Sequence, residues 1–428
     1  MSETAEKSGE ERNAVENAVF EVPEGKRFSV AAPGVLALSN GKLLASLDQT
    51  GPDVKTLTGK KGHDVQRGRW MQGRVMASAD GGASWKLSAT YPFRHASLFR
   101  DGGDVYLLGE ASGALVLMRS PDGGGSWSAP MELTGETGLH LTPGGMLEGD
   151  GSWLFVCQAP VGDGLGLQVF RAPRGASLMN RKAWMAGPVS AAMEALIPLR
   201  REAGFGVPAM GGGRLSWRHP VPLRVTAANG DGTGGTSLCL TLGATGGGRE
   251  NWCAFVRVDP ETLAVSLLQS PDGMPWSWLA MPGGQEVFSV LWDGPSRLYW
   301  LAGQRSNGGA DGANGWSAWI QGGDVEKGPK QTPRTVANTK VAAMGRRRLG
   351  LWFSADLLEW RYAGALFSGG EGASGVRCDP ALAVSGSMLV ALCRAGGERS
   401  RNERECQRIL CRCVPDFRRL AAGWNRDV

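Results

Sequence analysis

The chain has 428 residues, of which 65 are glycine, 16 are tryptophan and 20% are charged, and its formal net charge is +5 at pH 7. This small positive charge is spread along the sequence, which argues against nucleic acid as a partner. No apolar run reaches the roughly 18 residues that a membrane span requires, so no membrane partner is expected either.

The first segment, residues 1–19, is polar and charged and lacks the apolar core of a secretory signal. We expect it to be a disordered lead-in. Without a visible signal peptide, we expect the protein to be intracellular, with its cysteines reduced.

From residue 20 onward, apolar strands repeatedly meet at a glycine-centred turn. Asn-Gly and Asp-Gly pairs favour tight hairpin turns, and the flanking residues alternate or run apolar as buried strands do. Six such hairpins follow one another along the chain, at residues 34–47, 96–110, 145–158, 225–243, 288–303 and 381–395.

A second repeated phrase has the form Ser-x-Asp-x-Gly-x-x-Trp. It occurs around Asp80 and Asp122, occurs without the glycine around Asp356, and has a fourth, looser form around Asp272. The aspartate can accept hydrogen bonds from its own turn, the glycine supplies a left-handed backbone, and the tryptophan packs on a neighbouring sheet. We therefore interpret the phrase as a turn between the outer strands of a unit.

The six hairpins and the repeated turn phrase predict an all-β protein. We expect one six-bladed β-propeller domain over residues 20–425, closed by pairing an N-terminal strand with the last blade. The Ser-x-Asp phrase resembles the Asp-box (BNR) repeat of the sialidase superfamily. That resemblance implies six blades and a carbohydrate substrate or glycan partner. It also implies arginines that hold a sugar carboxylate, a tyrosine nucleophile with a glutamate partner, and an aspartate acid/base. We expect the protein to be a monomer.

The sequence departs from that pattern, because Ala31 stands where the first arginine of the resemblance would be. Candidate site residues are the polar ones that lead into the first strand of each unit, nearest the propeller axis. We expect His95, His140, Glu286 and Asp379 to be catalytic, and Arg94, Arg218 and Arg377 to bind substrate. Arg377 and Asp379 are two residues apart, so a regular strand would point both the same way, as an ion pair or as an axial binding pair.

Two functions from different classes remain open. One is a sialidase-like glycoside hydrolase that acts on an acidic or deoxy sugar, with an eliminative lyase on a uronate polymer as a variant in which histidine acts as the base. The other is a non-catalytic Asp-box propeller that binds a glycan or a protein. Phosphate-loop, zinc-protease and α/β-hydrolase motifs are missing from the sequence, so no cofactor or metal is expected. A metal site built from Cys406, Cys411 and Cys413 is the weaker alternative to reduced thiols in the core.

Overall fold

The computed structural model describes residues 15–64, 68–135, 138–142, 144, 146–149, 151–196, 216–226, 236–245, 252–267, 278–284, 286–305, 346–357, 359–402 and 404–422. Strands dominate this part of the chain, and its one α-helix, α1 (Met193–Leu196), is a single turn. The prediction of an all-β protein is confirmed. Within the same residues, no helix has the length and hydrophobicity that crossing a bilayer takes.

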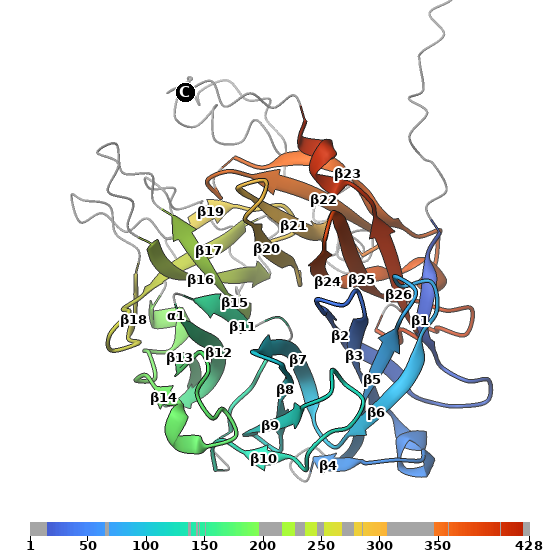
Figure 1. Ribbon diagram of the computed structural model, residues 1–428, viewed down its shortest axis with the longest axis horizontal. Coiled ribbons are helices and arrows are strands. Elements are labelled where there is room, and N and C mark those ends of the chain that lie inside the picture. The colour runs from blue at the N-terminus through green and yellow to red at the C-terminus, as the bar shows by residue number, and fades with distance from the viewer. Residues whose placement is uncertain are drawn as a thin grey trace, which may run out of the picture.

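The described strands form six antiparallel sheets that stand around a central axis (Figure 1). The first three sheets, in chain order, have these strands: β2 (Ser29–Ala37), β3 (Leu43–Thr50), β4 (Gly62–Asp64), β5 (Arg69–Ser78) and β6 (Lys86–Tyr91); β7 (Arg94–Asp101), β8 (Asp104–Ala111), β9 (Ala114–Ser120) and β10 (Met131–Glu132); β11 (Met146–Gly149), β12 (Ser152–Val161), β13 (Gly164–Pro173) and β14 (Met185–Ala186).

The last three sheets follow the same plan. Their strands are these: β15 (Ser216–Thr226), β16 (Thr236–Thr245), β17 (Trp252–Val258), β18 (Val265–Leu267) and β19 (Trp278–Ala280); β20 (Ser289–Asp293), β21 (Leu298–Gln304), β22 (Arg348–Ser354) and β23 (Arg361–Ser368); β24 (Arg377–Ser385), β25 (Met388–Ala395), β26 (Arg408–Val414) and β1 (Asn17–Glu21). Of these strands, β15, β20 and β24 lie nearest the axis. This radial arrangement is a β-propeller.

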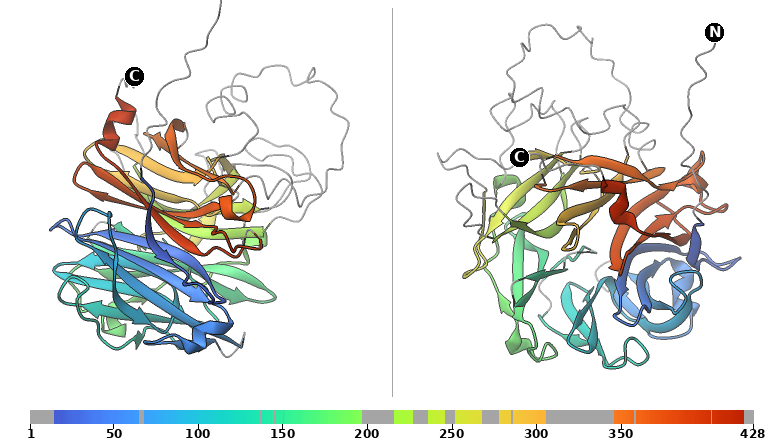
Figure 2. Two further views of the ribbon diagram at one scale, coloured as in Figure 1. Left: turned by 90° about the vertical axis from the view of Figure 1, so that its right-hand side faces the viewer. Right: turned by 45° about the horizontal axis from the view of Figure 1, so that its top comes forward.

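The ring is closed by β1, which comes first in the chain yet completes the last sheet. It pairs antiparallel with β26, placing Asn17 opposite Cys411 and Glu21 opposite Arg408. The blue strand therefore lies beside the red strands in Figures 1 and 2. The predicted closure by an N-terminal strand is confirmed, but this strand begins at Asn17, within the segment 1–19 that the sequence predicts to be a disordered lead-in.

The hydrophobic core is divided among the interfaces between successive sheets. In the described chain each apolar cluster takes its residues from two neighbouring sheets, and one cluster joins the last sheet to the first. Phe99 and Tyr106 of the second sheet, for example, share a cluster with Trp153 and Phe155 of the third, and the rings of Phe99 and Trp153 lie 5.0 Å apart. Burial of these alternating apolar faces stabilises the ring, because each buried side chain of this kind contributes about 1.5–3 kcal/mol.

The predicted turn around Asp80 joins β5 to β6. Ser78 Oγ donates to Asp80 Oδ1 at 2.7 Å, while the amide N–H groups of Gly82 and Ser84 donate to Ser78 Oγ and Asp80 Oδ1, both at 2.9 Å. Hydrogen bonds from Ser84 lower the pKa of Asp80 to about 2. The aspartate thus organises its own turn, as the sequence predicts.

Two further turns repeat this arrangement between outer strands, after β9 and after β22. After β9, the amide N–H of Gly124 donates to Ser120 Oγ at 2.7 Å, and Ser120 Oγ donates to Asp122 Oδ1 at 2.9 Å. In the third turn Asp356 accepts from Ser354 at 3.0 Å, and the amide N–H of Leu357 donates to Ser354 Oγ at 2.9 Å, as that of Gly82 does to Ser78, with a φ of 67° at Leu357. A non-glycine residue can therefore adopt the required left-handed backbone here. The fourth phrase, around Asp272, lies outside the described residues.

The described cysteines are free thiols, and all but Cys413 are buried. The sulfur atoms of Cys411 and Cys413 lie 3.9 Å apart on one face of β26, as their alternation predicts. Among the residues that the structure describes, no group of three His, Cys, Asp or Glu side chains could hold a metal ion.

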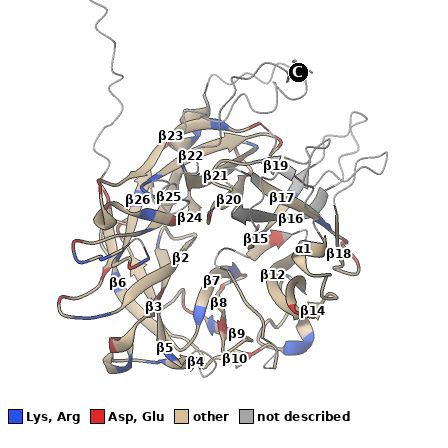
Figure 3. Ribbon diagram, turned by 180° about the vertical axis from the view of Figure 1, so that it is seen from behind, with Lys and Arg blue, Asp and Glu red and all other residues tan. Residues whose placement is uncertain are grey.

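Acidic and basic segments both recur around the ring in Figure 3.

Candidate functional site

A cleft of about 830 Å³ opens at the axis, where the innermost strands face one another. All six sheets contribute to its lining, through Pro33 of β2, Ser97 of β7, Leu147 of β11, Val221 of β15, Ser289 of β20 and Ala381 of β24. Its size is typical of a small-molecule site, since such pockets span about 300–1,000 Å³.

Four of the innermost strands, β2, β7, β15 and β24, carry a bulge near their first residues. In β2, Ala31 pairs with Asp48 but Gly34 pairs with Ser46, so one extra residue is inserted on the inner strand. Equivalent register shifts separate Arg94 from Ser97, Arg218 from Val221, and Cys378 from Ala381. A bulge of this kind changes the direction of a side chain within a sheet.

Each bulge contains one residue with a left-handed backbone. The φ angles are 52° at Ala32, 53° at His95, 56° at His219 and 51° at Asp379, and all four residues line the axial cleft. A non-glycine residue in this conformation costs about 1–3 kcal/mol, and such strain concentrates at binding and active sites. The bulges thus bring two imidazoles and one carboxylate to the cleft.

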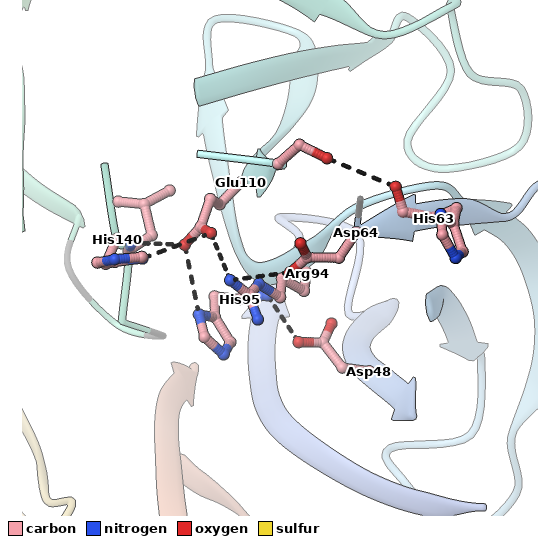
Figure 4. Close-up of polar contacts among 9 residues, drawn as sticks. Asp48, His63, Asp64, Arg94, His95, Glu110 and His140 are labelled. Atoms are coloured by element: carbon pink, nitrogen blue, oxygen red, sulfur yellow. Dashed lines mark hydrogen bonds and ion pairs between the residues drawn. The ribbon is translucent and has the colours of Figure 1, made fainter. Parts of the chain in front are cut away.

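Behind His95 lies the fully buried carboxylate of Glu110, on β8 (Figure 4). Glu110 accepts a hydrogen bond from Arg94 at 2.6 Å and another from the amide N–H of Leu141 at 3.1 Å. The Nδ1 atoms of His140 and His95 lie 3.7 and 3.9 Å from its two oxygens. One carboxylate therefore connects two of the predicted catalytic histidines with the predicted substrate-binding arginine.

The environment of His95 favours its neutral form. Burial is the largest influence and lowers the pKa of the imidazole from 6.5, against the opposing charge of Glu110. Burial acts to raise the pKa of the Glu110 carboxyl. Hydrogen bonding to His140 and the charge of Arg94 outweigh burial, so that pKa is lowered overall. A neutral imidazole beside an ionised carboxylate is suited to accept a proton. The His95 side chain is 34% exposed although its Nδ1 is buried, so other ring atoms face the cleft.

Asp379 reaches the same cleft from the sixth sheet. Its Oδ2 lies 3.1 Å from Nη1 of Arg394, a residue of β25 that also lines the cleft. The guanidinium fixes the direction of the carboxylate, and both side chains keep part of their surface accessible, at 21% for Asp379 and 16% for Arg394.

Of the other predicted residues, His140, Glu286, Arg377 and Arg94 lie outside the cleft lining. Glu286 forms an ion pair with Arg346 at 2.9 Å, and Arg377, which is 9% exposed, forms one with Glu16 at 3.2 Å. Arg94 is engaged by Glu110 and lies 3.7 Å from Asp64. Arg218 lies in β15, but its side chain is outside the described part of the structure.

The expectation that Arg377 and Asp379 share a face does not hold in the structure. It assumed a regular strand, whereas the bulge between Cys378 and Ala381 inserts a residue and breaks the alternation. Asp379 lines the cleft, and Arg377 turns instead to Glu16 and the carbonyl oxygen of Val376.

Among the residues of the site that were not found from the sequence are Glu110, behind the cleft, and Arg394, Glu148, Arg174 and Arg224, which line it. Glu110 is the one charged residue within the otherwise apolar segment 105–111, and a lone charge in a buried strand is a usable signal. Arg394 sits in a similar apolar strand. Glu148 lies in β11 and forms an ion pair with Arg174, which lines the cleft with it.

No family model matches this sequence, and no curated protein matches it. Among solved structures, the chain is similar to a protein of unknown function from Dyadobacter fermentans, with 12% identity and a TM-score of 0.53 over 94% of this chain and 98% of that one. At this identity the likeness shows a shared fold alone.

Two enzymes show weaker likenesses. Trypanosoma rangeli sialidase aligns at 13% identity with a TM-score of 0.49 over 92% of this chain, which spans 58% of the sialidase chain. The catalytic domain of a GH62 α-L-arabinofuranosidase from Coprinopsis cinerea aligns at 11% identity with a TM-score of 0.41, over 94% of this chain and 96% of that one. Both TM-scores lie below 0.5, so neither likeness bears on what this chain does, and the propeller fold is established by its own six sheets.

Proposed function

We propose that this protein is a sialidase-like glycoside hydrolase, built as a six-bladed propeller with Asp-box turns, that acts on an acidic or deoxy sugar in the axial cleft. The observation that carries the proposal is the set of strained bulges that present His95, His219 and Asp379 to one cleft. Strain of this kind, repeated in separate sheets at one place, is difficult to explain by packing alone.

The chemistry of the cleft suits a sugar acid. Arg394 lines it beside Asp379, Arg174 and Arg224 line its other end, and guanidinium groups bind planar carboxylates well. Hydrolysis of a glycosidic bond also needs proton transfer and stabilisation of positive charge on the sugar ring. We assign proton transfer to His95, positioned by Glu110, and charge stabilisation to the carboxylate of Asp379.

A second candidate, a non-catalytic glycan-binding propeller, is favoured by one feature of the first sheet. Ala31, Ala32 and Pro33 form an apolar wall of the cleft, and Ala31 stands where the resemblance places an arginine. A sugar could pack against this wall without any bond being broken.

The deciding experiment is a release assay with purified protein on fluorogenic α-sialoside, fucoside, rhamnoside and glucuronide substrates. We expect turnover of one substrate, with losses of at least about 100-fold in His95→Ala and Asp379→Ala, as removal of a proton-transfer group produces. His63→Ala is the matched control, because His63 is exposed on β4 and does not line the cleft.

Absence of turnover together with glycan binding on an array would favour the second candidate. Formation of an unsaturated uronate, seen by its ultraviolet absorbance, would instead identify the lyase variant. Turnover that persists in both cleft variants would overturn the assignment of the site.

A further inference from the structure

We propose that Trp292 is the stacking platform of a second sugar subsite, so that the axial cleft accommodates an oligosaccharide and not a single ring. This inference rests on the proposed function, since it takes the ligand of the cleft to be a carbohydrate. Trp292 lines the cleft, and 44% of its surface is exposed, which is unusual for so large an apolar side chain.

Trp292 lies at a different level of the cleft from the two histidines and Asp379. His95, His219 and Asp379 lie near the beginnings of their strands, whereas Trp292 is the penultimate residue of β20, beside the hairpin turn. A strand rises about 3.3 Å per residue, so β7 extends roughly 20 Å from His95 to its end. In every sheet the innermost strand starts near the bulge position and ends at a hairpin turn to the next strand outward, so strand beginnings and strand ends mark opposite ends of the cleft.

The indole is held rigidly in this position. Trp292 pairs across the hairpin with Tyr299, and the two rings lie 4.6 Å apart. Tyr299 is 3% exposed, and its hydroxyl donates a hydrogen bond to the carbonyl oxygen of Arg224. The next residue, Asp293, is 4% exposed and forms an ion pair with Arg418 at 2.6 Å, which fixes the turn. A preorganised aromatic ring loses little entropy when a ligand stacks on it.

Charged groups accompany the indole at this end of the cleft. Arg224 lies near the end of the described part of β15, and Glu148 and Arg174 form an ion pair in which the two side chains are 52% and 47% exposed. A pyranose ring would place its C–H face on the indole and direct its hydroxyl or carboxylate groups to these side chains. An exposed tryptophan is not by itself a sugar subsite. Trp70 is 40% exposed, but it lies on β5 against His63 and outside the cleft lining.

The test uses an array of acidic sugars that carries monosaccharides and oligomers of two to four rings, followed by calorimetric titration of the glycans that bind. We expect oligomers to bind wild-type protein more tightly than the monosaccharide. In Trp292→Ala, affinity for oligomers long enough to span the cleft should fall about tenfold, the order of one lost aromatic contact, with monosaccharide affinity unchanged. Trp292→Phe should retain most of the affinity, and Trp70→Ala should match wild type.

The outcomes separate this proposal from the one on which it rests. If Trp292→Ala binds oligomers as wild type does, or loses monosaccharide affinity equally, the second subsite is wrong while the sugar cleft stands. If no glycan binds wild-type protein, both proposals fail. Thermal unfolding of each variant shows whether the fold is intact, and Trp292→Phe keeps the question answerable should the alanine variant unfold.

Discussion

The backbone N–H of His95 donates a 2.6 Å hydrogen bond to the carboxylate of Asp48, which lies on a different sheet. The bond joins the bulge of β7 to the second strand of the first sheet, and so couples a site residue to the interface beneath it. Asp48 is 3% exposed. Burial raises its pKa to about 7, although the hydrogen bonds from His95 and Tyr91 act to lower it.

This buried carboxyl predicts an unusual dependence of stability on pH. Between about pH 4 and pH 7 folded Asp48 keeps a proton that the unfolded chain has released, so its contribution to stability is lost as pH rises through that window. The total change is roughly 4 kcal/mol. Asp48→Asn keeps an acceptor for the His95 amide but cannot ionise, so its unfolding free energy in urea should vary less between pH 5 and 8. The same slope in variant and wild type would contradict the raised pKa.

Glu110 and Asp104 provide a matched pair of carboxylates on β8, one buried and one accessible. Glu110→Ala leaves Arg94, which is 16% exposed, without its closest carboxylate, and should reduce the unfolding free energy by about 3–5 kcal/mol. Asp104→Ala removes the partner of Arg119, which is 46% exposed, and should cost less than about 1 kcal/mol. Urea denaturation of both variants measures the difference, and equal losses would show that Glu110 is not a buried ion-pair partner.

The carboxylate of Glu110 should also shift the pH at which kcat/KM falls on the acid side. With the pKa of His95 lowered below 6.5 by burial, the acid limb of kcat/KM should lie below pH 6.5 if His95 is the base. The charge of Glu110 acts to raise that pKa, so Glu110→Gln should move the limb to still lower pH. A purely structural role for Glu110 would change the rate without moving the limb. His63→Ala is the control and should leave the profile unchanged.

The turn after β9 offers a test of backbone geometry against packing. Gly123 and Gly124 both have a left-handed backbone, with φ of 67° and 88°. A Cβ at Gly124 would lie 2.9 Å from side-chain carbons of Leu44, whereas one at Gly123 would lie 3.4 Å from Leu38. Gly123→Ala should therefore cost about 1–2 kcal/mol from the backbone alone. Gly124→Ala should cost about 1–3 kcal/mol more from overpacking, and thermal unfolding would show it as the lower Tm.

The sequence predicts the fold well because the signals for it are local. The turn around Asp80 is specified within seven residues, and the hairpin turns by Asn-Gly and Asp-Gly pairs. Local patterns also place His95 and Asp379 at the axis, since both residues lead into an innermost strand. The ion pairs formed by arginine cannot be predicted in this way, because the two partners come from segments far apart in the sequence. Glu286 pairs with Arg346, and Arg377 pairs with Glu16.

The bulges are the other feature that alternation of residue types cannot predict. Ala32, His95 and Asp379 have little in common as side chains, yet each adopts the same left-handed backbone at the same place in its sheet. The conformation is imposed by pairing with the second strand, which is a non-local contact. Propensity therefore indicates which residues reach the axis, but not which way they point.

The pairing of β1 with β26 has a consequence for how the protein assembles during synthesis. The strand β1, which completes the last sheet, leaves the ribosome before the other described strands, and its partner β26 emerges after them. Until then the nascent ring has two unpaired edges, and exposed edges readily pair with other chains. Closure also requires contacts between residues at opposite ends of the sequence, which makes folding slow. The nascent chain is thus most exposed to mispairing with its neighbours just before β26 emerges.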